Sequence, residues 1–169
     1  MLSLRLRASL LLRTRFRRAW HDASNADRAA LWNALKQSKT LAEADSALAQ
    51  LRPLQHEVEY GIAMKTYGQL EQWKSTLALL EELRCPSSTI KPNAIIYSVA
   101  LVACSRARQA MAALELLPAM RADNVAPNLI HYTALMGACI KYVPPRPDLE
   151  HISGLWKQMQ ADGLKLEIR

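Results

Sequence analysis

Apolar residues recur at helical spacing along most of this chain, in short stretches separated by prolines and small polar residues. Residues three and four positions apart share one face of a helix, so these stretches predict amphipathic helices. From residue 57 onward, the pattern predicts helices at about residues 57–67, 71–84, 94–105, 109–123, 129–141 and 148–161. Upstream, the segment Ser24-Asn25-Ala26-Asp27 supplies N-cap residues for a helix that ends near Gln37, and Thr40 with Glu43 has capping-box spacing for a helix at about 41–51.

Residues 94–128 are the clearest copy of a repeated unit. The segment follows one Pro-Asn pair, Pro92-Asn93, and ends on another, Pro127-Asn128. Three of its features recur 35 positions later: Tyr97 as Tyr132, Ala103-Cys104 as Ala138-Cys139, and Arg106 as Lys141. A period of this size indicates an array of helical hairpins, each of which buries its apolar face against its neighbours.

The repeat period divides the chain into an N-terminal segment, a helical hairpin and three units. The segments are 1–20, 21–56, 57–93, 94–128 and 129–167. We expect the hairpin at 21–56 to be a degenerate repeat or an N-terminal cap, because it lacks a clear repeat signature. The last unit carries a proline-rich insertion at 143–147 between its two helices.

Leucines predict which face of the second helix in each unit is buried. Leu77, Leu80 and Leu83, with Leu79 beside them, line the inner face of the first such helix, and the three recur 37 positions later as Leu114, Leu117 and Met120. Other residues recur at the spacing of the repeat itself, namely Tyr60, Tyr97 and Tyr132, and Cys104 and Cys139. That spacing favours packing between helices over contact with a ligand or reactive chemistry.

The composition supports an all-α protein that is not an enzyme. Half of the residues are hydrophobic, only 5 are glycine, and 6% are aromatic. The 3 cysteines and 4 histidines show no metal-ligand spacing, and no phosphate loop, nucleophile elbow or paired-carboxylate motif is present. We therefore expect no catalytic residues, metal or cofactor, and no membrane-spanning segment.

The formal charge of +7 belongs mostly to residues 1–20, which hold six of the 22 basic residues and no acidic residue. The remaining chain has 16 basic and 15 acidic residues, so its charge does not by itself indicate nucleic acid. A segment rich in arginine, leucine and serine predicts a mitochondrial presequence, and hence a matrix location or, alternatively, another organelle. The alternative is a basic arm that stays attached and touches RNA or lipid.

The repeat resembles the pentatricopeptide repeat. The resemblance rests on the 35-residue period, the tyrosine early in the first helix, the run Ala113-Leu114-Glu115-Leu116-Leu117-Pro118-Ala119-Met120 in the second helix, and the closing Pro-Asn. It covers residues 57–167, about two-thirds of the chain. The tetratricopeptide repeat has a similar period, but its Trp-x-x-Leu-Gly-x-x-Tyr start is absent. The resemblance implies a right-handed α-solenoid of helix-turn-helix repeats.

The resemblance also implies a site for single-stranded RNA along the first helices, with one base per repeat. In the family, the fifth and last residues of each unit face the edge of a base. Here these pairs are Gly61 with Asn93, Ser98 with Asn128, and Thr133 with Glu167. The second residue packs against the faces of the bases, and it is Val58, Ile95 and Ile130 in the three units. Only the central unit has a complete pair, which resembles an adenine reader.

Two further interpretations concern the basic residues and the partners. Arg106 and Lys141 end their helices in the same register, where they either neutralise phosphates or interact with the helix dipole. Three repeats can supply roughly 3–9 kcal/mol by stacking, and micromolar affinity alone requires about 8 kcal/mol. We therefore expect protein partners or a larger organellar complex. The leading hypothesis is an accessory RNA-binding protein in mitochondrial RNA processing, stability or translation, and the alternative is a scaffold subunit of a complex such as the mitochondrial ribosome.

Overall fold

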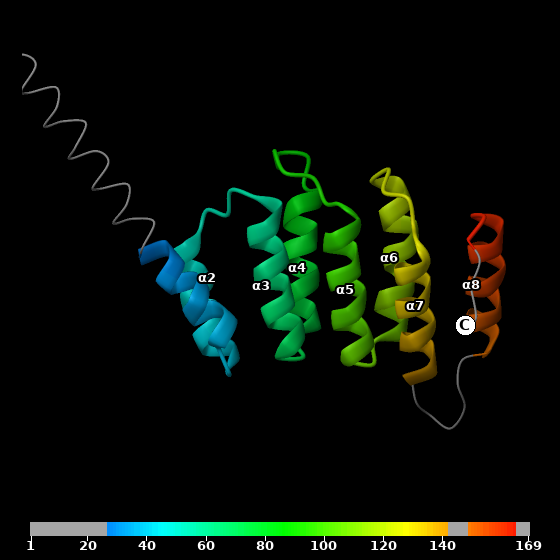
Figure 1. The fold of residues 1–169 in the computed structure, drawn as a ribbon, viewed down its shortest axis with the longest axis horizontal. Coiled ribbons are helices and arrows are strands. Elements are labelled where there is room, and N and C mark those ends of the chain that lie inside the picture. The colour runs from blue at the N-terminus through cyan, green and yellow to red at the C-terminus, as the bar shows by residue number, and fades with distance from the viewer. Residues whose placement is uncertain (1–26, 142–148, 165–169) are drawn as a thin grey trace, which may run out of the picture.

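The computed structural model describes residues 27–141 and 149–164, and all regular structure in these ranges is helical. After a helical stretch at residues 27–37, the helices are α2 (Leu41–Leu51), α3 (Glu57–Gln69), α4 (Trp73–Arg84), α5 (Ala94–Arg106), α6 (Ala110–Ala122), α7 (Leu129–Lys141) and α8 (Leu149–Ala161). Figure 1 shows them standing side by side in one extended row. The expected α-solenoid is confirmed. The presequence at 1–20, the insertion at 143–147 and Glu167 lie outside the described residues.

The same turn ends most of these helices, and it explains where each one stops. Glu71, Arg108, Asn124 and Gly163 have φ between 56° and 75°, in the left-handed region. The next residue then donates its N–H back across the turn, as Gln72 does to the Tyr67 carbonyl at 2.9 Å. This is the Schellman arrangement, which satisfies carbonyls at a helix end. Because Glu71 lies in this turn, the helix predicted to start at residue 71 begins at Trp73 instead.

The helices form two layers with different packing. We call α3, α5 and α7 the A helices, and α4, α6 and α8 the B helices. α3 contacts α5 and α5 contacts α7, whereas the B helices do not contact one another within the described ranges. Each of α4 and α6 contacts instead the A helix of the next unit. The A helices are therefore the closely packed layer, which makes them the inner layer where the array curves.

The buried face of the B helices is wider than the predicted stripe. In α4 the buried leucines are Leu79, Leu80 and Leu83, and Leu77 is half-buried at the edge of the core. In α6, Leu116 is buried and Leu114 is likewise half-buried against the core. The face is wide because α4 and α6 each touch two A helices, so their contact surface exceeds a single stripe.

A tyrosine, a carboxylate and an arginine link each unit to the one before it. Tyr97 in α5 donates to Asp123 Oδ2 at 2.5 Å, and Arg84 at the end of α4 donates to the same oxygen at 2.9 Å. The same grouping occurs twice more, as Tyr60 with Glu82 and Arg52, and as Tyr132 with Asp162 and Arg121. The repeating tyrosines are thus packing residues, as the sequence predicted, since all three are at most 5% exposed.

These contacts shift the protonation of their members. Burial, with the hydrogen bond to Glu82 next, raises the pKa of Tyr60 to about 12. Burial alone would raise the pKa of Glu82, but hydrogen bonds from Arg52 and Tyr60 outweigh it and hold that pKa below its usual value. The neutral tyrosine and the ionised carboxylate are therefore the stable pair near neutral pH.

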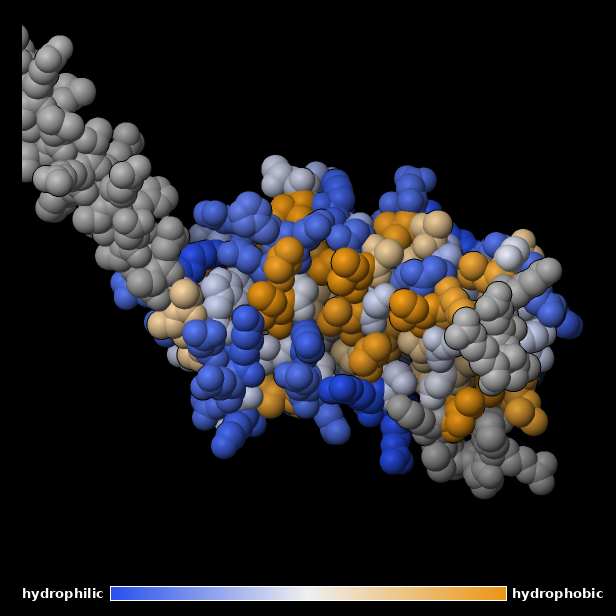
Figure 2. Space-filling view, viewed as in Figure 1, coloured by the Kyte–Doolittle hydropathy of each residue, from blue (hydrophilic) through white to orange (hydrophobic). Residues whose placement is uncertain are grey.

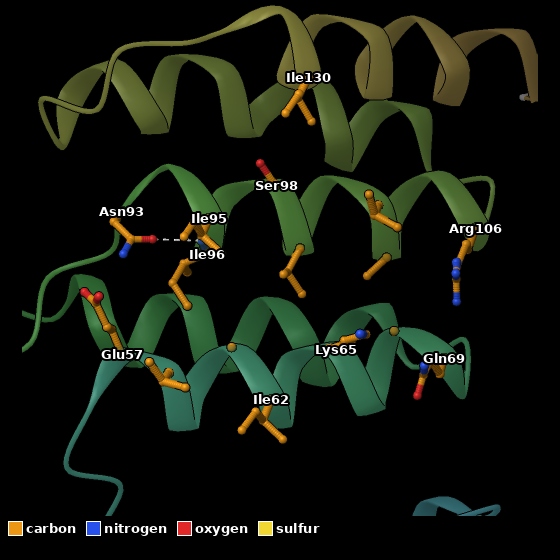
Figure 3. Close-up of a pocket in the computed structure, with 16 residues that line it drawn as sticks. Glu57, Ile62, Lys65, Gln69, Asn93, Ile95, Ile96, Ser98, Arg106 and Ile130 are labelled. Atoms are coloured by element: carbon orange, nitrogen blue, oxygen red, sulfur yellow. Dashed lines mark hydrogen bonds between the residues drawn. The ribbon is translucent and has the colours of Figure 1, made fainter. Parts of the chain in front are cut away.

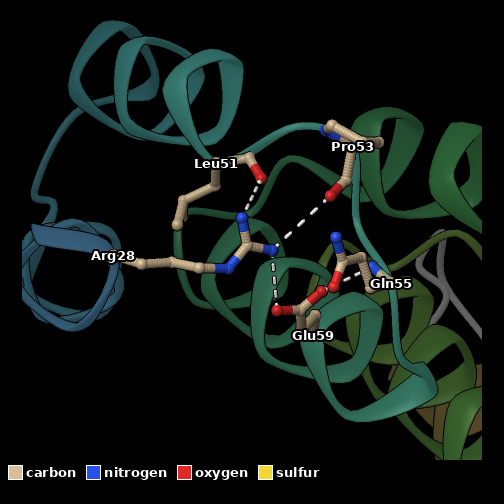
Figure 4. A network of polar contacts seen from close by, with 5 residues as sticks. All are labelled: Arg28, Leu51, Pro53, Gln55 and Glu59. Atoms are coloured by element: carbon tan, nitrogen blue, oxygen red, sulfur yellow. Dashed lines mark hydrogen bonds and ion pairs between the residues drawn. The ribbon is translucent and has the colours of Figure 1, made fainter. Parts of the chain in front are cut away.

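Besides Arg52, a second arginine attaches the N-terminal hairpin to the first unit. Arg28 donates to the Leu51 carbonyl at 2.9 Å and to the Glu59 carboxylate at 2.8 Å (Figure 4). Glu59 also accepts from the Gln55 backbone N–H at 2.6 Å. Burial raises the pKa of Glu59, yet these hydrogen bonds lower it overall. Residues 27–51 are therefore joined to α3 by charge as well as by apolar contact.

Candidate nucleic-acid interface

An open groove of about 660 Å³ runs between α3 and α5 and reaches Ile130 on α7 (Figure 3). It contains seven of the eleven residues that the sequence predicts for the site: Val58, Gly61, Asn93, Ile95, Ser98, Arg106 and Ile130. Asn128 and Thr133 do not line it, and the other two, the side chain of Lys141 and Glu167, lie outside the described part of the chain. The structure thus brings together residues of three successive units on the inner layer of helices.

Three aliphatic side chains stand out of this face at equivalent places. Val58, Ile95 and Ile130 are each the second residue of an A helix, and they are 65%, 70% and 62% exposed. Figure 2 shows orange apolar surface crossing the middle of the molecule over these helices. Single exposed aliphatic residues are ordinary, but a contiguous apolar patch on one face indicates a binding surface.

The apolar surface extends along each A helix with helical spacing. The apolar positions are Val58-Ile62 on α3, Ile95-Val99-Val102 on α5, and Ile130-Ala134-Gly137 on α7, and the polar residues Lys65, Gln69 and Arg106 continue the same spacing on α3 and α5. The groove is lined by Ile62, Val99 and Val102 in addition to the predicted residues. Sequence reasoning missed these three, although the spacing i, i+4, i+7 from Val58 and Ile95 was the signal that could have found them.

Asn93 and Asn128 cap the A helices that follow them. Asn93 Oδ1 accepts from the Ile96 N–H at 3.0 Å. Asn128 Oδ1 accepts from the N–H groups of Ile130 at 3.0 Å and His131 at 3.2 Å. Capping fixes the orientation of each amide, because the oxygen must face the helix. The Nδ2 hydrogens are then the groups that either asparagine can offer to a ligand.

Ser98 is held by a histidine that the sequence analysis passed over. The Ser98 hydroxyl donates to the Ala94 carbonyl at 2.9 Å, and His131 Nε2 lies 3.0 Å from Ser98 Oγ. His131 is fully buried, and its Nδ1 lies 3.0 Å from the Asn128 backbone nitrogen. One side chain of the third unit therefore contacts both members of the predicted reading pair. No sequence signal identified it, because the histidines share no spacing.

The other predicted reading positions are less complete. Gly61 lies in the groove, and a Cβ added there would meet Ile96 Cδ1 at 3.6 Å, an ordinary contact. Thr133 is exposed, and its hydroxyl donates to the Ile130 carbonyl at 2.9 Å. The space for a reading side chain thus exists in the first unit, but the side chain itself is absent.

The basic residues lie at the opposite end of the groove from the capping asparagines. Arg106 is exposed at the last position of α5, eight residues beyond Ser98, which is about 12 Å along a helix. Lys65 is also exposed and lines the groove from α3. Lys141 ends α7, but its side chain lies outside the described part of the chain. A cationic rim is therefore separated along the helices from the predicted reading positions.

The described residues hold neither a metal-ligand cluster nor a membrane-spanning helix. Within 27–141 and 149–164, no three side chains of His, Cys, Asp or Glu are arranged as a metal site. No helix in the same ranges has the length and apolar character needed to cross a membrane.

Paired helices that share an inner layer with a ligand-sized groove define a helical-hairpin repeat solenoid. Residues 79–142 match the family model described as the pentatricopeptide repeat domain. Over these residues the chain carries the pentatricopeptide repeat.

The fold is shared with solved structures of one larger protein. The chain superposes on the pentatricopeptide repeat protein PPR10, crystallised with an 18-nt psaJ RNA element, with a TM-score of 0.65 and 19% identity. A form of PPR10 with three cysteines replaced by serine, bound to the same element, gives the same values. Each match covers 83% of this chain and 20% of the other, so the chain spans about one fifth of the solved protein. No curated protein sequence matches this chain.

Proposed function

We propose that this chain binds single-stranded RNA on the inner face of its A helices. The observation that carries the proposal is the row formed by Val58, Ile95 and Ile130, which are exposed at the same position of three successive units. PPR10, whose structures share the fold, was crystallised with RNA. Aliphatic side chains held at repeat spacing can sandwich bases one after another, as in proteins that read one base per helical repeat.

The central unit reads the base that enters between Ile95 and Ile130. Its edge then faces Ser98 and Asn128, which supply a hydroxyl and an amide. As in the pairing scheme of the family, we expect adenine at this place. In the first unit, Gly61 leaves Asn93 without a second side chain, so that unit contributes packing but little selectivity.

The affinity of this surface alone is low. Two bases fit between three aliphatic residues, and stacking contributes about 1–3 kcal/mol per base, so the sandwich supplies roughly 2–6 kcal/mol. Micromolar binding requires about 8 kcal/mol. The protein therefore acts with partners or within a larger assembly. Its proposed setting is RNA processing, stability or translation in the mitochondrial matrix, and mass spectrometry of the mature N-terminus tests the presequence on which this setting rests.

Fluorescence anisotropy with labelled RNA tests the sandwich. Ile95→Ala and Ile130→Ala remove exposed side chains, so we expect the free energy of unfolding to change by less than about 0.5 kcal/mol. Binding of a single strand that contains adenine should weaken at least several-fold in each variant, and it should fall with added salt. Met111→Ala is the matched control, because Met111 is exposed on the B helix α6. Unchanged binding by both isoleucine variants contradicts the proposal.

Replacing one capping asparagine by aspartate separates reading from capping. Asp is as good an N-cap as Asn, so Asn128→Asp keeps the helix start but removes the Nδ2 donors. We expect the preference for adenine to be lost while the melting temperature is kept. Asn93→Asp makes the same chemical change beside Gly61, where no complete pair exists, and should alter base preference less. Equal effects of the two variants contradict the assignment of the central pair.

A scaffold function is the second candidate, and the aliphatic lining of the groove favours it. Ile62, Val99 and Val102 make the groove more apolar than a base sandwich requires, which suits the apolar face of a partner helix. Purification from the organelle after nuclease treatment distinguishes the two candidates. A stoichiometric protein complex that survives nuclease, together with absent RNA binding, favours the scaffold.

A further inference from the structure

The contacts of His131 determine which of its nitrogens carries the hydrogen. Nδ1 faces the Asn128 backbone N–H at 3.0 Å, so Nδ1 must accept. In a neutral imidazole the other nitrogen is then the donor. Nε2–H therefore points at the Ala94 carbonyl at 2.9 Å and at Ser98 Oγ at 3.0 Å.

This arrangement fixes what each reading residue can offer to a base. The Ser98 hydroxyl hydrogen is directed to Ala94, and Nε2–H of His131 lies against the oxygen, so Ser98 presents an acceptor to the groove. Asn128 Oδ1 is occupied by two backbone N–H groups, so Asn128 presents donors. The pair thus has a fixed polarity, with an acceptor on α5 and a donor at the start of α7.

The histidine is specific to this junction between units. The third residue of α7 is His131, whereas the third residue of α3 is Glu59, which binds Arg28, and that of α5 is Ile96. Ile96 is an aliphatic residue that is 2% exposed, so the same place in the fold accepts a side chain without hydrogen bonds. Burying an imidazole at this place of α7 is therefore not a requirement of the helix packing.

We propose that His131 is a positioning residue, which fixes Ser98 as an acceptor beside the capped amide of Asn128 and so makes the central unit distinguish amino bases from keto bases. Adenine and cytosine place an exocyclic amino donor beside a ring-nitrogen acceptor on their Watson–Crick edges. Guanine and uracil place a carbonyl acceptor beside a ring N–H donor. An acceptor at Ser98 beside a donor at Asn128 can hydrogen-bond to the amino group and ring nitrogen of adenine or cytosine, and it opposes the carbonyl and ring N–H of guanine or uracil. This inference rests on the proposed RNA binding, and the expected adenine belongs to the amino class.

The test uses four single-stranded RNAs of about ten nucleotides, identical except for a central A, C, G or U. Competition anisotropy gives the preference of the parent chain, which should favour A and C over G and U. His131→Ile carries the residue found at the same place in α5, and we expect it to reduce that preference by about three- to tenfold, the worth of one hydrogen bond. His131→Gln keeps an N–H donor within reach of Ser98, so it should retain most of the preference.

The outcomes separate this inference from the proposed function. If the parent binds none of the four RNAs, both are overturned. If the parent prefers amino bases and folded His131→Ile keeps that preference, His131 is structural only, and the proposed function stands. A preference of the parent chain for A and G over C and U, or the reverse, overturns the assignment of an acceptor to Ser98 and a donor to Asn128. Nitrogen-15 NMR of the parent checks the tautomer without RNA, and a hydrogen on Nδ1 also overturns the inference.

Discussion

The contact between Tyr97 and Asp123 gives the sharpest test of how the two helices of one unit are held together beside the arginine of the unit before. Tyr97→Phe removes one hydroxyl and leaves the buried ring, so it deletes the 2.5 Å hydrogen bond to Asp123 without opening a large cavity. A hydrogen bond to a charged group contributes about 1.5–3 kcal/mol. The Asp123 side chain is 22% exposed and keeps its contact with Arg84, so we expect a loss of about 1.5 kcal/mol.

Urea denaturation followed by circular dichroism measures this loss. Tyr97→Ala is the contrasting variant, because it also removes the ring from a fully buried site and should cost about 3–5 kcal/mol. A double-mutant cycle with Asp123→Asn isolates the pair, and we expect a coupling of about 1 kcal/mol. Tyr132→Phe repeats the change one unit later and should give a similar loss.

Two results would refute this reasoning. A loss below about 0.5 kcal/mol in Tyr97→Phe would place the contact among ordinary surface effects. A loss as large as that of Tyr97→Ala would mean that the hydroxyl, rather than the ring, holds α5 to the end of α6. In either case the tyrosine would not have the role in the repeated tyrosine–carboxylate–arginine grouping that its geometry indicates.

Three other predictions concern pH, glycine and base reading. The hydrogen bond from Tyr132 lowers the pKa of Asp162 from 3.8, so the folding stability that this carboxylate contributes should be complete above pH 3.8 and lost as the pH falls further. Burial raises the pKa of Tyr132 from 10.0 to about 12, so the stability that the neutral tyrosine contributes should be lost as the pH rises from 10 through that value. Thermal melts at a series of pH values measure both losses. Gly154→Ala should stabilise α8 by about 0.5–1 kcal/mol, because its Cβ would meet nothing within 4 Å. Gly68→Ala should give no such gain, because its Cβ would lie 3.1 Å from a side chain of α5. Equal changes in the free energy of unfolding in urea would contradict this prediction. Gly61→Ser completes the pair of the first unit and should tighten binding of RNA with a second adenine severalfold by anisotropy, while no gain would count against base reading there.

Much of the fold follows from local sequence. Helix bounds deviate by at most two residues from the predicted ones, because apolar spacing, capping residues such as Thr40 and Asn93, and Pro-Asn turns act within a few residues of each other. The largest shift of a helix start, at Trp73, reflects a left-handed residue that is not glycine. Glu71 gives no local sign of that conformation.

The candidate site was predictable only in part. The second position of each unit could be read from the repeat period, and the structure places Val58, Ile95 and Ile130 on one surface, as expected. Whether their neighbours would enlarge the groove depended on how far apart α3 and α5 stand. The polarity of the central pair depended on a side chain 33 positions from Ser98, which no local pattern connects to it.

The sequence by itself determined that this protein is a row of helical hairpins, because period and amphipathic spacing are properties of neighbouring residues. Only the tertiary structure decided how wide the buried faces of α4 and α6 are, since each of these B helices packs against two A helices at once. It also decided the partners of Arg84 and Ser98, because side chains from successive units meet only after the units have stacked. Local patterns specify elements, and contacts between elements specify the site.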